Sequence, residues 1–171
     1  VIFELEEIDG EQYLNTYDLV MVDEEGTFYY AGRMNKFFVN NKNVRFDAGL
    51  VERAVTAQPD IESCRLAPAY DKALRDTVPV LYVKPVMSAS KAKDAVRDAL
   101  KGAFIDEGVV KETNLPSECI ITDEIPYNAM GKVDVHQITK GTVDGYRYRV
   151  IPVRRGRKLI DVRLETYRNA F

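Results

Sequence analysis

The chain has 171 residues, of which 46% are hydrophobic and 30% are charged, and its formal net charge is −3. This balance is typical of one globular domain with a modest core, and it excludes a general nucleic-acid-binding surface over the whole chain. Cys64 and Cys119 lie too far apart for a metal site, and no apolar run resembles a signal peptide or a membrane span. We therefore expect reduced cysteines and a cytoplasmic location.

Residues 1–33 predict strands and a hairpin. Glu24, Glu25 and Gly26 form a turn signal between the apolar run 19–22 and a β-prone stretch. Asp18 and Arg33 flank this hairpin, so we expect them at the same end of it. A carboxylate beside a guanidinium can bind a polyol or a phosphate, although a surface salt bridge is the simpler interpretation.

The middle of the chain predicts a small α+β domain in which helices pack on a mixed sheet. Asp47 can cap a first helix that ends before Pro59, and Ser90 can cap a second one. A loop is expected at 70–76. Short strands are expected at 37–39, 44–46, 61–66, 78–83 and 118–121.

Residues 125–134 predict a turn-rich loop that presents Lys132 beside Gly131. Lysine is a compact charge on a long flexible stem, so such a loop can bring it to an anion. By itself the pair is a weak signal, because most Gly-Lys pairs are solvated turns. His136, the chain's one histidine, is more simply explained as an exposed residue than as a proton shuttle.

The last 31 residues are basic. Residues 141–171 hold 8 of the chain's 24 basic residues and 3 of its 27 acidic ones, which leaves 16 basic and 24 acidic residues before them. Alternation predicts two strands, 146–153 and 159–164, joined at Gly156. We favour a solvated hairpin that complements the acidic remainder over a site for phosphate or an acidic partner. A nucleic-acid-binding module would depend on this tail alone.

Three segments, in this order, resemble signatures of the adenylate-forming superfamily. This superfamily includes acyl-CoA synthetases, adenylation domains of peptide synthetases, D-alanine ligases and luciferases. Residues 13–19 resemble its Y-x-R-T-G-D-L segment, and residues 23–33 resemble the D-x-D-G stretch that ends in G-R. Residues 125–134 resemble its closing P-x-x-x-x-G-K-[VI]-D. The resemblance extends from about Tyr13 to His136.

The resemblance implies a role for five residues. Lys132 corresponds to the catalytic lysine, and Asp18 to the carboxylate that holds the ribose hydroxyls of AMP. Arg33 corresponds to a second nucleotide contact. Asn35 occupies the hinge position, and Arg45 lies in a loop that faces the acceptor thiol in thioester-forming relatives.

The chain departs from the family pattern at several positions. Tyr17 replaces the glycine before the ribose-binding Asp, and Asn35 stands where Asp or Lys is usual. The loop before Arg45 lacks the family's glycine, and Leu50 replaces a Glu, whereas Glu52 fits. The altered loop bears on CoA binding more than on adenylation.

The family pattern also implies a domain division. Residues 1–33 correspond to the end of the N-terminal AMP-binding domain, 34–36 to the hinge, 37–140 to the C-terminal lid, and 141–171 to a basic β-hairpin extension. The phosphate loop and the acid pocket of the family are missing from the sequence. We therefore expect a piece of a longer protein whose first partner is its own N-terminal domain, and an inactive isolated fragment.

The implied reaction is AMP-forming. ATP activates a carboxylic acid to an acyl-adenylate, which passes to the thiol of CoA or of a carrier protein. Magnesium is expected with ATP, bound mainly by the missing domain, and no membrane or nucleic-acid partner is expected. The alternative is a degenerate, non-catalytic lid that only binds a partner. The acid is selected in the missing domain, so this sequence does not name it.

Overall fold

The computed structural model describes residues 5–14, 16, 18–33, 37–40, 43–130, 133–134, 137–138, 140 and 142–167. The chain divides into two compact units, unit 1 (Val1–Phe37) and unit 2 (Phe38–Phe171). Among the described residues, no helix is both long and apolar enough to cross a membrane.

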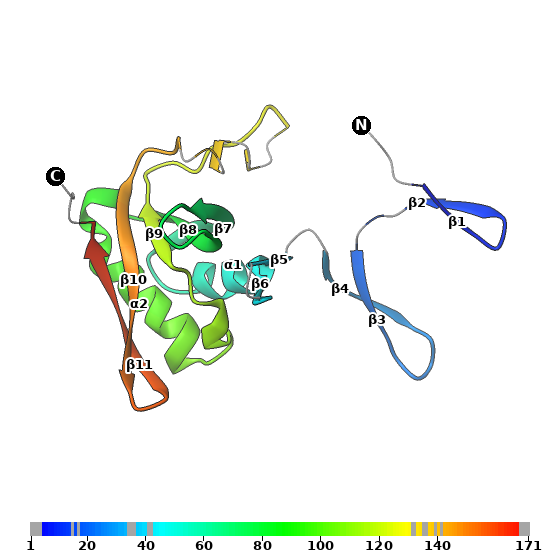
Figure 1. Cartoon of the computed structure of the whole chain (residues 1–171), viewed down its shortest axis with the longest axis horizontal. Coiled ribbons are helices and arrows are strands. Elements are labelled where there is room, and N and C mark those ends of the chain that lie inside the picture. Colours follow the sequence, from blue (N-terminus) through cyan, green and yellow to red (C-terminus); the bar gives the residue numbers. More distant parts are fainter. Residues whose placement is uncertain are drawn as a thin grey trace. The chain divides into compact units, whose positions relative to one another are not determined.

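Unit 1 contains two antiparallel hairpins (Figure 1). The first joins β1 (Leu5–Ile8) to β2 (Glu11–Leu14), and the second joins β3 (Asp18–Val22) to β4 (Phe28–Arg33). The second turn forms where Glu24-Glu25-Gly26 predicted it. Gly26 takes φ +83°, a left-handed conformation that glycine adopts without strain.

Unit 2 is built on a five-stranded sheet in the order β11-β10-β9-β8-β7. Only β8 and β9 are parallel among its pairs, and α2 lies on the connection between them. This confirms the predicted α+β class with a mixed sheet. The strands are β7 (Ile61–Asp71), β8 (Asp76–Pro85), β9 (Glu118–Ile121), β10 (Tyr146–Arg155) and β11 (Lys158–Thr166).

The remaining elements of unit 2 are short. A two-stranded sheet pairs β5 (Phe37–Val39) with β6 (Arg45–Asp47). The helices are α1 (Ala48–Thr56) and α2 (Lys93–Lys101), which continues into the π-helical turn η3 (Gly102–Asp106). The described residues also form the 3-10 turns η2 (Ala89–Lys91) and η4 (Glu112–Asn114).

Helix α1 begins as the sequence predicts. The carboxylate of Asp47 accepts a 2.8 Å hydrogen bond from the backbone N–H of Leu50, which satisfies one of the free donors of the first turn. Val51, Ala54 and Val55 form the buried face of the helix.

Helix α2 does not begin as predicted. Ser90 lies inside η2, and α2 starts at Lys93 without a side-chain cap. Asp123 accepts a 2.7 Å hydrogen bond from the N–H of Ala89, so a contact far along the chain fixes this entry instead of Ser90. The loop predicted at 70–76 is also shorter, because β7 and β8 stay paired as far as Asp71 opposite Asp76.

The sheet has a core on each face. The helix-side core packs α1 and α2 against alternate residues of the strands, and the loop-side core lies on the other face. The helix-side core includes Val51, Val55, Leu81, Val83, Val96, Leu100, Cys119, Ile121, Val150 and Val162. The loop-side core consists of Ala67, Val78, Val80, Tyr82, Ile120, Ile125 and Ile138.

The basic hairpin is part of this sheet. Strand β10 pairs with both β9 and β11, and Val150, Leu159 and Leu164 are buried in the helix-side core. Arg147 forms an ion pair with Glu118 at 3.3 Å, and Arg154 pairs with Glu112. These two contacts join basic residues of the hairpin to acidic residues before it.

Candidate active-site segments

The β3–β4 hairpin brings Asp18 and Arg33 together. They are direct partners in the strand register, at the open end of the hairpin. The side chain of Asp18 is exposed, whereas that of Arg33 lies outside the described part of the structure. The backbone of unit 1 therefore puts a carboxylate residue opposite an arginine residue, as the turn signal predicted.

Asp23 shapes the other end of this hairpin. Its carboxylate accepts hydrogen bonds from the N–H groups of Thr27 (2.8 Å) and Glu25 (3.0 Å) and from the hydroxyl of Tyr29 (3.0 Å). The bond from Thr27 contributes most to a lowered pKa of Asp23, because it favours the ionised form. Asp23 is thus a turn-forming residue.

The flanks of the lysine segment (residues 125–134) pair with each other, and we call this pair of flanks, 126–127 and 133–134, its neck. Gly131 and Lys132 lie outside the described residues, but both sides of them are described. Tyr127 and Val133 form an antiparallel bridge, and the N–H of Asp134 donates a 2.7 Å hydrogen bond to the carbonyl of Pro126. These two contacts hold the upstream and downstream flanks of the segment together.

Residues on both sides of this neck pack into the loop-side core. Ile125 and Ile138 are buried on the sheet, and Val133 packs against the same cluster. The hydroxyl of Tyr82 donates a 2.9 Å hydrogen bond to the carbonyl of Ile138. Apolar contacts and one buried hydrogen bond therefore attach the flanks of the lysine segment to β8 and β9.

In sequence, the predicted hinge and acceptor residues lie on either side of the boundary between the units. Asn35 is outside the described residues. Arg45 begins β6 and is exposed, and the turn before it contains Asn43 at φ +58°. This is the left-handed region, which asparagine tolerates better than most residues. Asn43 thus adopts a conformation that a glycine would otherwise supply.

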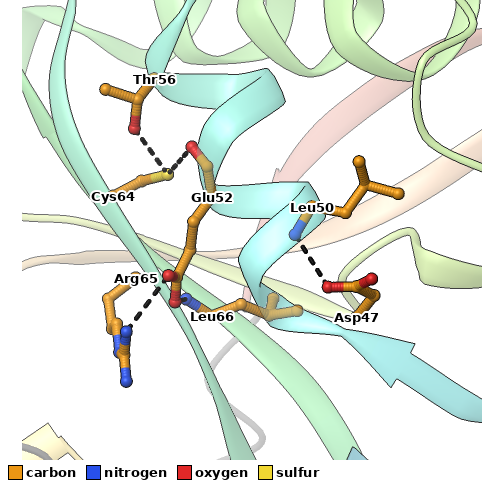
Figure 2. A network of polar contacts seen from close by, with 7 residues as sticks. All are labelled: Asp47, Leu50, Glu52, Thr56, Cys64, Arg65 and Leu66. Carbon is orange, nitrogen blue, oxygen red and sulfur yellow. Dashed lines mark hydrogen bonds and ion pairs between the residues drawn. The ribbon is translucent and has the colours of Figure 1, made fainter. Parts of the chain in front are cut away.

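Glu52 has a structural role that the sequence did not reveal. It reaches from α1 to β7, where its carboxylate accepts hydrogen bonds from the N–H of Leu66 and the guanidinium of Arg65, both at 3.1 Å (Figure 2). The Glu52 carbonyl also accepts from the thiol of Cys64. Glu52 therefore ties the first helix to the sheet.

A cavity of about 680 Å³ lies beside the neck of the lysine segment. Its walls come from η2, from the segment that follows β9 and from the residues that lead into β10, and they include Ala89, Asp123, Pro126, Tyr127, Gln137 and Tyr146. The sequence did not predict this cavity. The available signal was topological, since parallel strands open their carboxyl ends at one edge of a sheet.

The described residues offer no ready metal site. Within that part of the chain, no group of three or more His, Cys, Asp or Glu side chains is arranged to hold a metal ion.

No protein-family model matches the chain. Its sequence is 27% identical over 134 residues to the D-alanine--D-alanyl carrier protein ligase of Lactiplantibacillus plantarum, covering 78% of this chain and 26% of the relative. It is 23% identical over 131 residues to a probable CoA ligase of Humulus lupulus, covering 75% and 22%. The chain thus spans about a quarter of the length of these relatives.

Solved structures share the fold. ATP-bound MatB from Rhodopseudomonas palustris matches with a TM-score of 0.58 and 19% identity, over 80% of this chain and 25% of that one. MenE, the o-succinylbenzoate CoA synthetase from Bacillus subtilis in complex with its acyl-adenylate intermediate, matches with a TM-score of 0.54 and 22% identity, over 73% and 24%. The solved structures show the shared fold, and the sequence similarity to the two ligases supports a C-terminal domain of an adenylate-forming enzyme.

Proposed function

We propose that this chain supplies the lid of an ATP-dependent, AMP-forming acid–thiol ligase of the cytoplasm. The observation that carries the proposal is sequence similarity to a carrier-protein ligase over 78% of the chain, with the lysine motif downstream of the Asp18–Arg33 hairpin. The activity belongs to the longer protein, in which an N-terminal domain binds ATP and the acid. The isolated fragment is inactive under this proposal.

The exposed apolar side chains of unit 1 support the proposal that an N-terminal domain packs against it. Met21, Phe28 and Tyr30 are 63%, 70% and 68% exposed, and Val20, Met21 and Val22 are exposed in succession. Consecutive residues of a strand point to opposite faces, so both faces of this hairpin present apolar side chains. A two-stranded hairpin is at best marginally stable alone, and a strand that is apolar on both faces is typical of a buried sheet.

In the proposed reaction, an oxygen of the acid attacks the α-phosphorus of ATP, and the bond to pyrophosphate breaks. Lys132 stabilises the negative charge that develops between the carboxylate oxygen and the phosphorus, and it positions the two groups. Asp18 accepts hydrogen bonds from the ribose hydroxyls while it is ionised, and Arg33 donates to the nucleotide. Magnesium belongs to the N-terminal domain, and no role of these residues depends on it.

Passage of the acyl group to a thiol requires a second arrangement of the lid. Rotation about Asn35 turns the face that bears Arg45 toward the acceptor, in the manner of hinged domains. CoA and a carrier protein are both compatible with the named relatives. A degenerate lid that only binds a partner is the second candidate, supported by Tyr17, by Asn35 and by the absence of the family's glycine before Arg45.

The test is Lys132→Ala in the full-length protein. Pyrophosphate release would be measured with D-alanine, o-succinylbenzoate and a fatty acid, the acids suggested by the names of matched proteins. We expect acid-dependent release by the natural protein and a loss of at least about 100-fold in the variant, because one transition-state donor is removed. Nucleotide affinity should remain.

Lys140→Ala is the matched control, because Lys140 is an exposed lysine eight residues further along. It should leave pyrophosphate release unchanged. Natural-level turnover in Lys132→Ala would remove Lys132 from the mechanism. A full-length protein that binds ATP but releases no pyrophosphate with any acid would favour the degenerate lid.

A further inference from the structure

Tyr82 is a polar residue inside the loop-side core. It lies in β8, is only 2% exposed, and points to the sheet face opposite the helices. Its hydroxyl donates to the carbonyl of Ile138, 56 residues further along the chain, at 2.9 Å. Burial raises the pKa of Tyr82, so the hydroxyl stays protonated and remains a donor at neutral pH.

Ile138 belongs to the downstream flank of the lysine segment. Its N–H donates to the carbonyl of Asp134 at 3.2 Å, and the carboxylate of Asp134 accepts from the backbone and side-chain nitrogens of Gln137 at 3.2 and 2.9 Å. Asp134 in turn bonds to Pro126 on the upstream flank. A chain of hydrogen bonds therefore links the Tyr82 hydroxyl to the neck of the lysine segment.

We propose that Tyr82 is a positioning residue for Lys132, because its hydroxyl attaches the downstream flank of the lysine segment, at Ile138, to the sheet. The inference rests on the proposed function, since it gives Tyr82 a part only if Lys132 acts in adenylation. A lysine side chain is flexible, so the position of its ammonium group depends on how firmly its backbone is held. Removing one buried hydrogen bond at Ile138 leaves a carbonyl without its partner and loosens this support.

The test is Tyr82→Phe in the full-length protein, which keeps the ring and its packing and removes only the hydroxyl. We expect kcat for acid-dependent pyrophosphate release to fall about 10- to 100-fold, the range that a misplaced catalytic group produces. KM for ATP should stay within about twofold, because the ribose contacts are assigned to Asp18 on unit 1. Tyr70→Phe, at a 65% exposed tyrosine of the β7–β8 hairpin, is the matched control.

A double-mutant cycle separates positioning from general weakening of the fold. If Tyr82 acts through Lys132, adding Tyr82→Phe to Lys132→Ala should cause no further loss of rate. The inference is overturned if Tyr82→Phe keeps the natural kcat, or if it lowers the rate of the Lys132→Ala background by the same factor again. A natural rate in Lys132→Ala counts against the proposed function, whereas a normal Tyr82→Phe beside an impaired Lys132→Ala counts only against Tyr82.

Discussion

Burial and hydrogen bonding determine the chemistry of the two thiols. Cys64 lies between Thr56 and the carbonyl of Glu52, and burial is the main cause that raises its pKa to about 11 (Figure 2). Cys119 is fully buried, and its pKa lies still further above the ordinary range. The nucleophile in thiol chemistry is the thiolate, so both residues should be inert near neutral pH.

Alkylation with iodoacetamide at pH 8 tests this conclusion. With a pKa of about 11 in place of 9.0, the thiolate fraction of Cys64 falls about 100-fold. Mass spectrometry should therefore show slow labelling of the native protein and rapid labelling of both cysteines in guanidinium. Labelling of native Cys64 at the denatured rate would contradict the prediction.

The same shift affects stability at high pH. Because the pKa of Cys64 is higher in the folded state than in the unfolded state, this thiol leaves the free energy of unfolding constant below pH 9 and lowers it as the pH rises toward 11.

At the scale of elements, the basic hairpin contains an unfavourable pair. Arg155 and Lys158 face each other across the β10–β11 register, and both are exposed. Like charges directly opposite in a sheet are destabilising. Lys158→Glu should therefore raise the free energy of unfolding by about 0.2–1 kcal/mol, as expected for an opposite-charge cross-strand pair.

Urea unfolding of unit 2 at low and high salt measures this effect. The gain from Lys158→Glu should shrink as salt increases, because exposed charges are screened. Lys140→Glu, at an exposed position outside the hairpin, serves as the control for a simple change of net charge. A gain that persists at high salt, or an equal gain in the control, would show that the Arg155–Lys158 pair is not its cause.

Local signals predicted some elements and missed others for a physical reason. Asp47 and the apolar spacing of α1 are close in sequence, and they predicted that helix correctly. The entry to α2 depends on Asp123, which lies 34 residues after Ala89. The prediction that Ser90 caps this helix was therefore wrong. The roles of Tyr82 and Glu52 likewise depend on partners that only the folded sheet brings near.

Some features of the candidate site could likewise be predicted from the sequence, and others could not. The turn signal places Asp18 and Arg33 at the same end of one hairpin, whereas their direct pairing also depends on a register shift between Leu19 and Val20 that the sequence did not predict. The neck of the lysine segment depends on the loop-side core, to which β8, β9 and the segment itself all contribute. The resemblance therefore indicated Lys132 without indicating what holds the flanks of its segment.

At the scale of the whole molecule, the proposed cycle requires motion between the two units. Asp18 and Arg33 belong to unit 1, whereas Lys132 and Arg45 belong to unit 2. In the proposed cycle, adenylation brings Lys132 to the nucleotide site, and transfer brings Arg45 to the acceptor. Asn35 lies two residues before Phe37, where unit 1 ends, so it is placed in sequence to carry such a change.

Asn35→Pro in the full-length protein tests the hinge. Proline fixes φ near −65° and thereby restricts rotation at this position. If adenylation is possible in the fixed conformation and transfer is not, thioester formation with CoA or a carrier protein should fall at least about tenfold more than pyrophosphate release, as expected when a closure step is blocked. Asn35→Ala keeps this rotation free and should lower neither rate by as much. An equal loss of both half-reactions in Asn35→Pro would instead point to misfolding, because restricting a hinge separates the two steps.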